Sequence, residues 1–155
     1  ENKPMFEDVK NIEGFLLLKH LRTITKKNNI PLILCGDFNS KPSSSTYIGI
    51  TTGKSINKFD LEDFDYPKPF LNTPKVFTKN PLLSCYKKVM GREPLHSNYS
   101  KDFKATLDYI FVNDKIKVNG VLKELDQKYI KKFISSPNIH FPSDHFMQCA
   151  DLKII

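Results

Sequence analysis

Three short stretches of the sequence place polar side chains at the ends of predicted β-strands. They read LILCGDFNS, LDYIFV and PSDHF, and in each an acid stands where an apolar, β-rich run begins or ends. Gly36 permits an unusual backbone dihedral and Pro42 stops the first strand, which would hold the polar residues between them on a short turn. The candidate functional residues are Asp37, Asn39, Asp108, Asp144 and His145.

Hydrolysis of a phosphodiester needs residues of these types. A water must lie in line with the leaving group and be activated by a base or a metal, and donors or cations must stabilise the developing negative charge. Asp, Asn and His side chains at three strand ends supply these parts. Each stretch also has a structural interpretation, because Asp-x-Asn can cap its own turn and Asp108 can be a hydrogen-bonded structural acid. The combination of the three favours the functional interpretation.

Helices and strands alternate around these stretches, which predicts an α/β fold. Apolar residues at helical spacing predict an amphipathic helix from Asp8 to about Lys27. Several prolines predict a long loop between Lys54 and Leu82, and a polar loop is expected over 91–102. Strands are expected near 32–35, 107–112, 117–122 and 146–154; short helices are expected from about 45 to 53 and over 82–89, and 125–134 is helix or loop.

The composition indicates one folded domain with an affinity for anions. The 155 residues are 39% hydrophobic, which is enough to bury a core. The net charge of +7, from 24 Lys and Arg against 17 Asp and Glu, suits a nucleic-acid or nucleotide substrate, although a solvated basic surface has the same composition. No apolar run is long enough to span a membrane and no secretion leader opens the chain, so no membrane partner is expected.

The cysteines and the remaining histidines have structural interpretations. Three cysteines without CxxC spacing, two of them in apolar runs, predict buried, reduced thiols and a reducing compartment. The histidines outside the three stretches have no spaced partners and are predicted to be surface residues. These residues are Cys35, Cys85 and Cys149, and His20, His96 and His140.

The order GDFNS, LDYIF, PSDH resembles the second half of the endonuclease/exonuclease/phosphatase superfamily, magnesium-dependent enzymes that cleave phosphate esters. Two further segments give a finer resemblance. SNYSKDFK, residues 97–104, looks like the YTNYTxDFKG segment of the carbon catabolite repressor type (CCR4-like) of poly(A) deadenylase, and PMFEDVK, residues 4–10, looks like that branch's WDPxxxDVK segment. Ala105 stands where the family has a glycine. The likeness covers nearly the whole chain.

The resemblance implies a role for each candidate residue. Asp37 would be the general base and would help to hold magnesium, and His145 would donate to a non-bridging phosphate oxygen with its ring fixed by Asp108. Asp144 would support the metal. Asn39 would contact the phosphate and the substrate, and adenine would be bound by Asn39, Asn98, Phe103 and Pro4.

The resemblance also implies that part of the domain lies upstream. In this superfamily two similar α/β halves form a two-layer sandwich of the DNase I-like type, and the principal magnesium-binding glutamate belongs to the first half. That motif is not found here, so residues 1–155 are expected to be the C-terminal portion of a single catalytic domain. This portion alone is expected to be inactive, and the Mg²⁺ ligand glutamate is expected upstream of Glu1.

The expected function is that of a magnesium-dependent 3′–5′ exoribonuclease that shortens poly(A) and releases 5′-AMP. Two alternatives stay open: a 2′,5′-phosphodiesterase or dinucleotide phosphatase of the same superfamily, and a non-catalytic half-domain that contacts RNA or protein. The expected partners are poly(A) RNA and a CCR4-NOT-type deadenylase complex. The expected location is the cytoplasm, with the nucleus as a second location.

Overall fold

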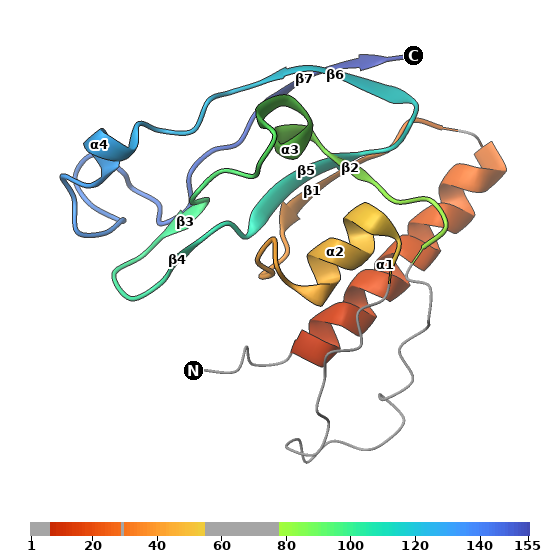
Figure 1. The fold of residues 1–155 in the computed structure, drawn as a ribbon, viewed down its shortest axis with the longest axis horizontal. Helices are drawn as coiled ribbons and strands as arrows, with labels where there is room; N and C mark the ends of the chain where they lie inside the picture. The colour runs from red at the N-terminus through yellow and green to blue at the C-terminus, as the bar shows by residue number, and fades with distance from the viewer. Residues whose placement is uncertain (1–6, 29, 55–77) are drawn as a thin grey trace.

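The structure, a computed structural model, describes residues 7–28, 30–54 and 78–155. Two helices, α1 (Glu7–Asn28) and α2 (Ser45–Thr52), lie side by side next to strands β1 (Ile33–Asp37) and β5 (Asp108–Val112) (Figure 1). The predicted long amphipathic helix is confirmed. The predicted short helix is α2, which begins at the N-cap Ser44 and ends at the left-handed C-cap Gly53.

The sheet that carries the first two sequence motifs has three strands in the order β1-β5-β2, where β2 is Leu83–Ser84. Both neighbours run antiparallel to β5. The last residue of β1, Asp37, therefore faces the first residue of β5, Asp108. The register of one strand pair thus places both acids at the same end of the sheet.

Alternation along β5 explains why this strand is apolar at nearly every position. Its side chains point to opposite faces of the sheet in turn, so that one set packs against the helices and the other against a second sheet. Tyr109 and Phe111 belong to the core beneath α1 and α2, together with Leu18, Tyr47, Ile50 and Leu82. Ile110 and Val112 pack in the second core with Cys85, Ile116, Val118, Val121, Ala150 and Leu152.

The second sheet pairs β6 (Ile116–Val121) with β7 (Ala150–Ile154), with a register irregularity between Val118 and Gly120. Helix α3 (Cys85–Met90) packs on β5 and β6. A short hairpin of β3 (Asn98–Tyr99) and β4 (Lys104–Ala105) projects from the same end of the molecule as the single turn α4 (Gln127–Ile130) (Figure 1).

Several boundaries predicted from the sequence were wrong. The helix expected over 82–89 is the short strand β2 followed by α3. The side chain of the N-cap Ser84 accepts from Lys87 N, so the helix begins at Cys85 and not at Leu82. The hairpin β3–β4 lies where a polar loop was expected. The final strand is shorter than predicted, because only Ala150–Ile154 finds a partner in β6. The predicted loop over 54–82 lies mostly outside the described residues.

The cysteine prediction was half right. All three thiols are free, but only Cys85 is buried, whereas Cys35 and Cys149 are exposed. Burial, with the charge of Glu93, raises the pKa of the Cys85 thiol to about 11. His20 and His140 are exposed as predicted, while His96 is half-buried. Within the described ranges, none of the helices combines the length and hydropathy that a membrane span needs.

Candidate active site

The three sequence motifs meet at one point. Asp37, Asp108 and His145 each offer a ligand atom, and these atoms all lie within 4.8 Å of one another. The register of β1 and β5 brings the two acids together. His145 arrives from the C-terminal segment, which pairs with β3 through an isolated bridge between Asn98 and His145. Residues more than a hundred positions apart in sequence therefore form a single cluster.

His145 is oriented by Asp108. Its Nδ1 lies 2.8 Å from Asp108 Oδ2. An ionised carboxylate only accepts hydrogen bonds, so Nδ1 carries the proton and donates. The other ring nitrogen, Nε2, is left for a substrate. The arrangement is that of a histidine held by a carboxylate, which can serve as a general acid or base.

The pKa of His145 is set by opposing effects. Partial burial lowers it, but the hydrogen bond and the charge of Asp108, assisted by the charges of Asp37 and Asp144, outweigh burial. The pKa is therefore raised above the ordinary histidine value. A larger fraction of the ring is protonated at neutral pH, which suits a donor to negatively charged oxygen.

Ser97 completes the support of Asp108, and sequence reasoning missed it. Its side chain is buried, and its hydroxyl donates to Asp108 Oδ2 over 2.6 Å while accepting from the backbone N–H groups of Leu107 and Asp108 at 2.8 and 2.9 Å. The hydroxyl therefore fixes both the side chain and the backbone of the acid. Only its position directly before Asn98 in the SNYSKDFK segment could have drawn attention to it.

The GDFNS turn holds Asp37 in place. Asn39 N donates to Asp37 Oδ1 over 2.7 Å, and Asn39 itself has a φ of 48°. Gly36 has a φ of 154°, a conformation that residues with side chains rarely adopt, as the sequence predicted for this position. The buried Tyr109 hydroxyl donates to Ser40 O over 2.6 Å and so ties the turn to β5.

The predicted metal residue Asp144 does not belong to the group of ligand atoms that lie within 4.8 Å of one another. Its carboxylate accepts from Asn98 Nδ2 over 3.2 Å, and its backbone oxygen accepts from Tyr99 N over 2.8 Å. Asp144 therefore connects the C-terminal segment to β3. Asn98 is buried, and its Oδ1 has no hydrogen-bond partner among the described residues.

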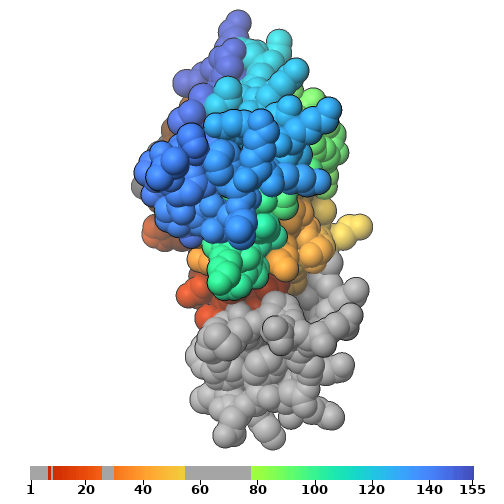
Figure 2. All heavy atoms as spheres, turned by 90° about the vertical axis from the view of Figure 1, so that its left-hand side faces the viewer, coloured from red at the N-terminus to blue at the C-terminus, as the bar shows by residue number. Residues whose placement is uncertain are grey.

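Phe103 and two lysines border the cluster on the hairpin side. Phe103 is 41% exposed at the β3–β4 turn, and Lys41 Nζ lies 5.3 Å from the centre of its ring. Lys10 Nζ donates to Asn39 O over 2.9 Å. Figure 2 shows the green hairpin between the blue C-terminal segments and the red and orange helices. The predicted substrate residue Pro4 lies outside the described residues.

The cluster has the donors of a divalent metal site. Two carboxylates within reach of one another suit a hard cation such as Mg²⁺, which usually takes one or two carboxylates and keeps several waters. The imidazole is less suited to Mg²⁺, and its Nδ1 is already engaged by Asp108. Asp37 and Asp108 therefore fit a metal as ligands, and His145 fits the role of a donor beside it.

The sequence of this chain is similar to those of a known family of proteins. The model of the Endonuclease/Exonuclease/phosphatase family matches residues 11–145. A curated relative, the CCR4-Not complex 3'-5'-exoribonuclease subunit Ccr4 of Candida glabrata, is 35% identical over 92% of this chain. The chain spans only 17% of that relative's length.

Two solved structures share the fold. The human Nocturnin catalytic domain with bound sulfate anion matches with a TM-score of 0.63 and 25% identity, over 100% of this chain and 44% of that chain. ANGEL2, described as a 2',3'-cyclic phosphatase in complex with adenosine-2',3'-vanadate, matches with a TM-score of 0.75 and 23% identity, over 98% of this chain and 54% of that chain. The α/β fold of DNase I-like type expected from the sequence is thereby confirmed.

Proposed function

We propose that this chain, which belongs to the endonuclease/exonuclease/phosphatase family, acts within a magnesium-dependent 3′–5′ exoribonuclease that shortens poly(A) and releases 5′-AMP. The observation that carries the proposal is the cluster of Asp37, Asp108 and His145 within 4.8 Å. The name of the Candida glabrata relative supports the exoribonuclease activity and membership of a CCR4-Not complex. We extend both to this protein, with the cytoplasm and the nucleus as its locations.

The chain is, in this proposal, the C-terminal portion of one catalytic domain. It covers about half of each structural neighbour. On β1, the side chain of Ile33 is 51% exposed and Cys35 is exposed, although both lie on a strand with apolar neighbours. Such a surface suits cover by further strands of the same domain. The chain by itself would then be inactive, with the main Mg²⁺ ligand supplied by the rest of the domain.

The residues of the cluster have distinct roles in the proposed reaction. Asp37, held by Asn39 N, accepts a proton from the attacking water. His145, with Nδ1 held by Asp108, donates from Nε2 to a non-bridging oxygen of the phosphate, where negative charge increases as the bond breaks. A bound Mg²⁺ would stabilise charge on the same phosphate. Asp37 and Asp108 would hold the ion, and Asp144 would support it from the C-terminal segment that is hydrogen-bonded to β3.

Adenine recognition is assigned to the hairpin side of the cluster. Phe103 offers an exposed aromatic face on which a base can stack, and the orphan Oδ1 of Asn98 can accept from an exocyclic amine. Asn39 is proposed to contact the same base, and so is Pro4, which lies outside the described residues. The basic charge of the chain favours a polyanionic substrate in general.

The test is a substrate panel with the full-length protein and Mg²⁺. Poly(A), 2′,5′-linked oligoadenylate and NADPH are compared, and His145→Ala and Asp37→Asn are measured beside the wild type. We expect poly(A) to be the preferred substrate, with 5′-AMP as product, and both variants to lose most of the activity while circular dichroism shows an intact fold. Unchanged turnover in the variants would refute the catalytic assignment.

The panel also separates the alternatives. Preference for 2′,5′-oligoadenylate or NADPH would transfer the protein to another activity of the same family. Binding of RNA without cleavage of any substrate would indicate a non-catalytic domain. His20→Ala serves as the matched control, because His20 is an exposed histidine on α1 outside the cluster.

A further inference from the structure

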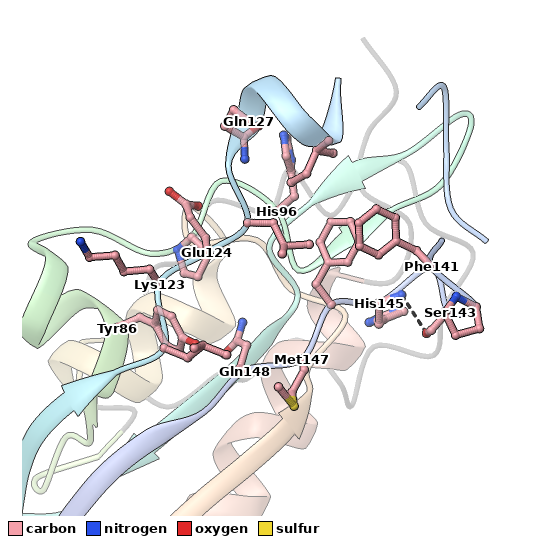
Figure 3. Close-up of a pocket in the computed structure, with 16 residues that line it drawn as sticks. Tyr86, His96, Lys123, Glu124, Gln127, Phe141, Ser143, His145, Met147 and Gln148 are labelled. Carbon is pink, nitrogen blue, oxygen red and sulfur yellow. Dashed lines mark hydrogen bonds between the residues drawn. The ribbon is translucent and has the colours of Figure 1, made fainter. Parts of the chain in front are cut away.

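A cavity of about 320 Å³ lies between the 122–127 segment with α4 and the 141–148 segment, and His145 is one of the residues that line it. Figure 3 shows His96, Glu124, His145 and Gln148 around it. Its volume is in the range of small-molecule sites, which begins at about 300 Å³. None of the residues to which the proposed function assigns adenine binding lines this cavity.

The walls of the cavity are mostly apolar and include aromatic rings. Phe141 and Phe146 both line it, with their ring centroids 5.4 Å apart in an edge-to-face arrangement. Ile130, the last residue of α4, is 2% exposed and forms part of the wall. A planar, uncharged group suits such walls better than a phosphate does, because an anion would lose its hydration there.

Two buried polar atoms belong to residues that line the cavity. Gln148 Oε1 and His96 Nδ1 have no hydrogen-bond partner among the residues that the structure describes. Gln148 Nε2 donates to Asp108 O over 2.8 Å, which fixes the orientation of the amide and leaves Oε1 as an acceptor. Burial first, then the charge of Lys104, lowers the pKa of His96, so its ring is neutral at neutral pH. A ligand with an N–H donor would supply the missing hydrogen-bond partner of Gln148 Oε1.

The cavity adjoins the reaction centre. His145 belongs both to the cluster with Asp37 and Asp108 and to the cavity lining. Gln148 contacts the backbone of Asp108 directly. A group in the cavity would therefore lie next to the phosphate that His145 contacts.

We propose that this cavity binds the nucleobase on the 5′ side of the scissile phosphate, with an exocyclic amine of the base donating to Gln148 Oε1. The inference rests on the proposed function, which assigns adenine binding to Phe103, and it takes that adenine to be the 3′-terminal one. The two bases that flank the reacting phosphate would then occupy two separate sites, because Phe103 does not line the cavity. Adenine fits the cavity as a planar ring with an exocyclic amine.

The experiment uses the full-length protein and short oligoadenylates in which one nucleotide is replaced by purine riboside, which lacks the exocyclic amine. We expect purine at the penultimate position to slow removal of the 3′-terminal nucleotide about fivefold to tenfold, the usual effect of one lost neutral hydrogen bond. In Gln148→Met the same replacement should have no further effect, because the acceptor is already gone.

A second variant blocks the cavity. Leu125→Trp places a large side chain at a lining residue that is 37% exposed, and it should weaken binding of oligoadenylate in EDTA, measured by fluorescence anisotropy. Val89→Trp is the matched control, because Val89 is a 45% exposed apolar residue on α3 outside the lining. This control should bind as the wild type does.

The outcomes separate the two proposals. Normal cleavage of oligoadenylate with no effect of penultimate purine, or with the same effect in Gln148→Met, overturns the cavity assignment alone. Inhibition by free adenosine that Leu125→Trp relieves, without any effect of the penultimate base, assigns the cavity to a free nucleoside and overturns the strand assignment. Failure of the wild type to cleave oligoadenylate overturns the proposed function and this inference together.

Discussion

Asp37 and Asp108 face each other directly in the antiparallel ladder of β1 and β5, at the end of the sheet. Two negative charges so close repel each other, and a cation bound between them would relieve this repulsion. A slip of one residue in this register would send one of the two acids to the other face of the sheet. The strand pairing therefore decides whether the cluster exists.

The facing carboxylates predict that divalent metal stabilises the protein. Addition of Mg²⁺ to the full-length protein should raise its melting temperature, since a ligand at 100 times its Kd adds about 2.7 kcal/mol to the unfolding free energy. Asp37→Asn should raise the Mg²⁺ concentration needed for half of this effect by about tenfold. Differential scanning fluorimetry gives both quantities.

Asp151→Asn is the control for metal binding, because Asp151 is an exposed acid on β7. Equal Mg²⁺ responses in the wild type and Asp37→Asn would remove Asp37 from the metal site.

The hydrogen bonds of Ser97 predict that its substitution lowers kcat and leaves KM nearly unchanged. Ser97→Ala removes the donor to Asp108 Oδ2 and leaves two backbone N–H groups without their acceptor, so unfolding should cost about 2 kcal/mol less. We expect kcat to fall about tenfold with little change in KM, because Ser97 is buried and its hydroxyl holds Asp108 in place. Steady-state kinetics on oligoadenylate measures the two constants.

Two variants test this position further. Ser97→Thr keeps the hydroxyl and should recover part of kcat. Ser136→Ala changes a serine that is 3% exposed and outside the cluster, and kcat should stay at the wild-type value. A rise in KM with constant kcat in Ser97→Ala would contradict a positioning role for the hydroxyl.

Lys41 predicts a salt-dependent contribution to RNA binding. Its ammonium group lies over Phe103 at the edge of the cluster, where it can neutralise a phosphate of the bound strand. Lys41→Ala should weaken binding of oligoadenylate at low salt and reduce the slope of log K against log salt by about 0.7, the value for one phosphate contact on a single strand. A salt titration by fluorescence anisotropy measures the slope.

Lys153→Ala provides the comparison, because Lys153 is an exposed lysine of β7 that faces Lys117 across the strand pair. Its slope should equal that of the wild type. If both variants change the slope equally, the charge of Lys41 acts only through the net charge of the protein.

Glu124 predicts a loss of stability in acid. Burial alone would raise its pKa, but the hydrogen bonds from Arg92 and from Leu95 N lower it below the ordinary glutamate value. A lowered pKa means that the ionised group stabilises the folded state above about pH 4.3, and that this stabilisation is lost as the pH falls toward the folded-state pKa. Glu124→Gln should therefore lower the unfolding free energy by about 1 to 2 kcal/mol at pH 7 and by progressively less below about pH 4.3.

Urea unfolding at a series of pH values checks this prediction. Glu13→Gln, a change at an exposed glutamate of α1, should leave the unfolding free energy nearly unchanged at every pH. A constant difference between the wild type and Glu124→Gln across the acid range would show that the carboxylate charge contributes nothing.

The sequence alone identified the α/β class and the long first helix, and it named the three residues that the structure brings into one cluster. Helical periodicity identified α1, and the apolar run of β5 identified a strand buried on both faces, because these patterns depend only on neighbouring residues. The short hairpin β3–β4 was missed, and the segment considered as a helix over 125–134 is longer than the single turn α4. Segments of two to four residues carry no periodic signal.

A functional role for Asp37, Asp108 and His145 could be hypothesised from residue types, because three such stretches at strand ends together favour it over turn capping. Their distances could not be read, since a sequence does not contain the register of β1 on β5 or the bridge that brings His145 to Asn98. Ser97 and the cavity beside His145 depended entirely on tertiary structure, because hydrogen bonds and enclosed space arise only when segments distant in sequence pack together.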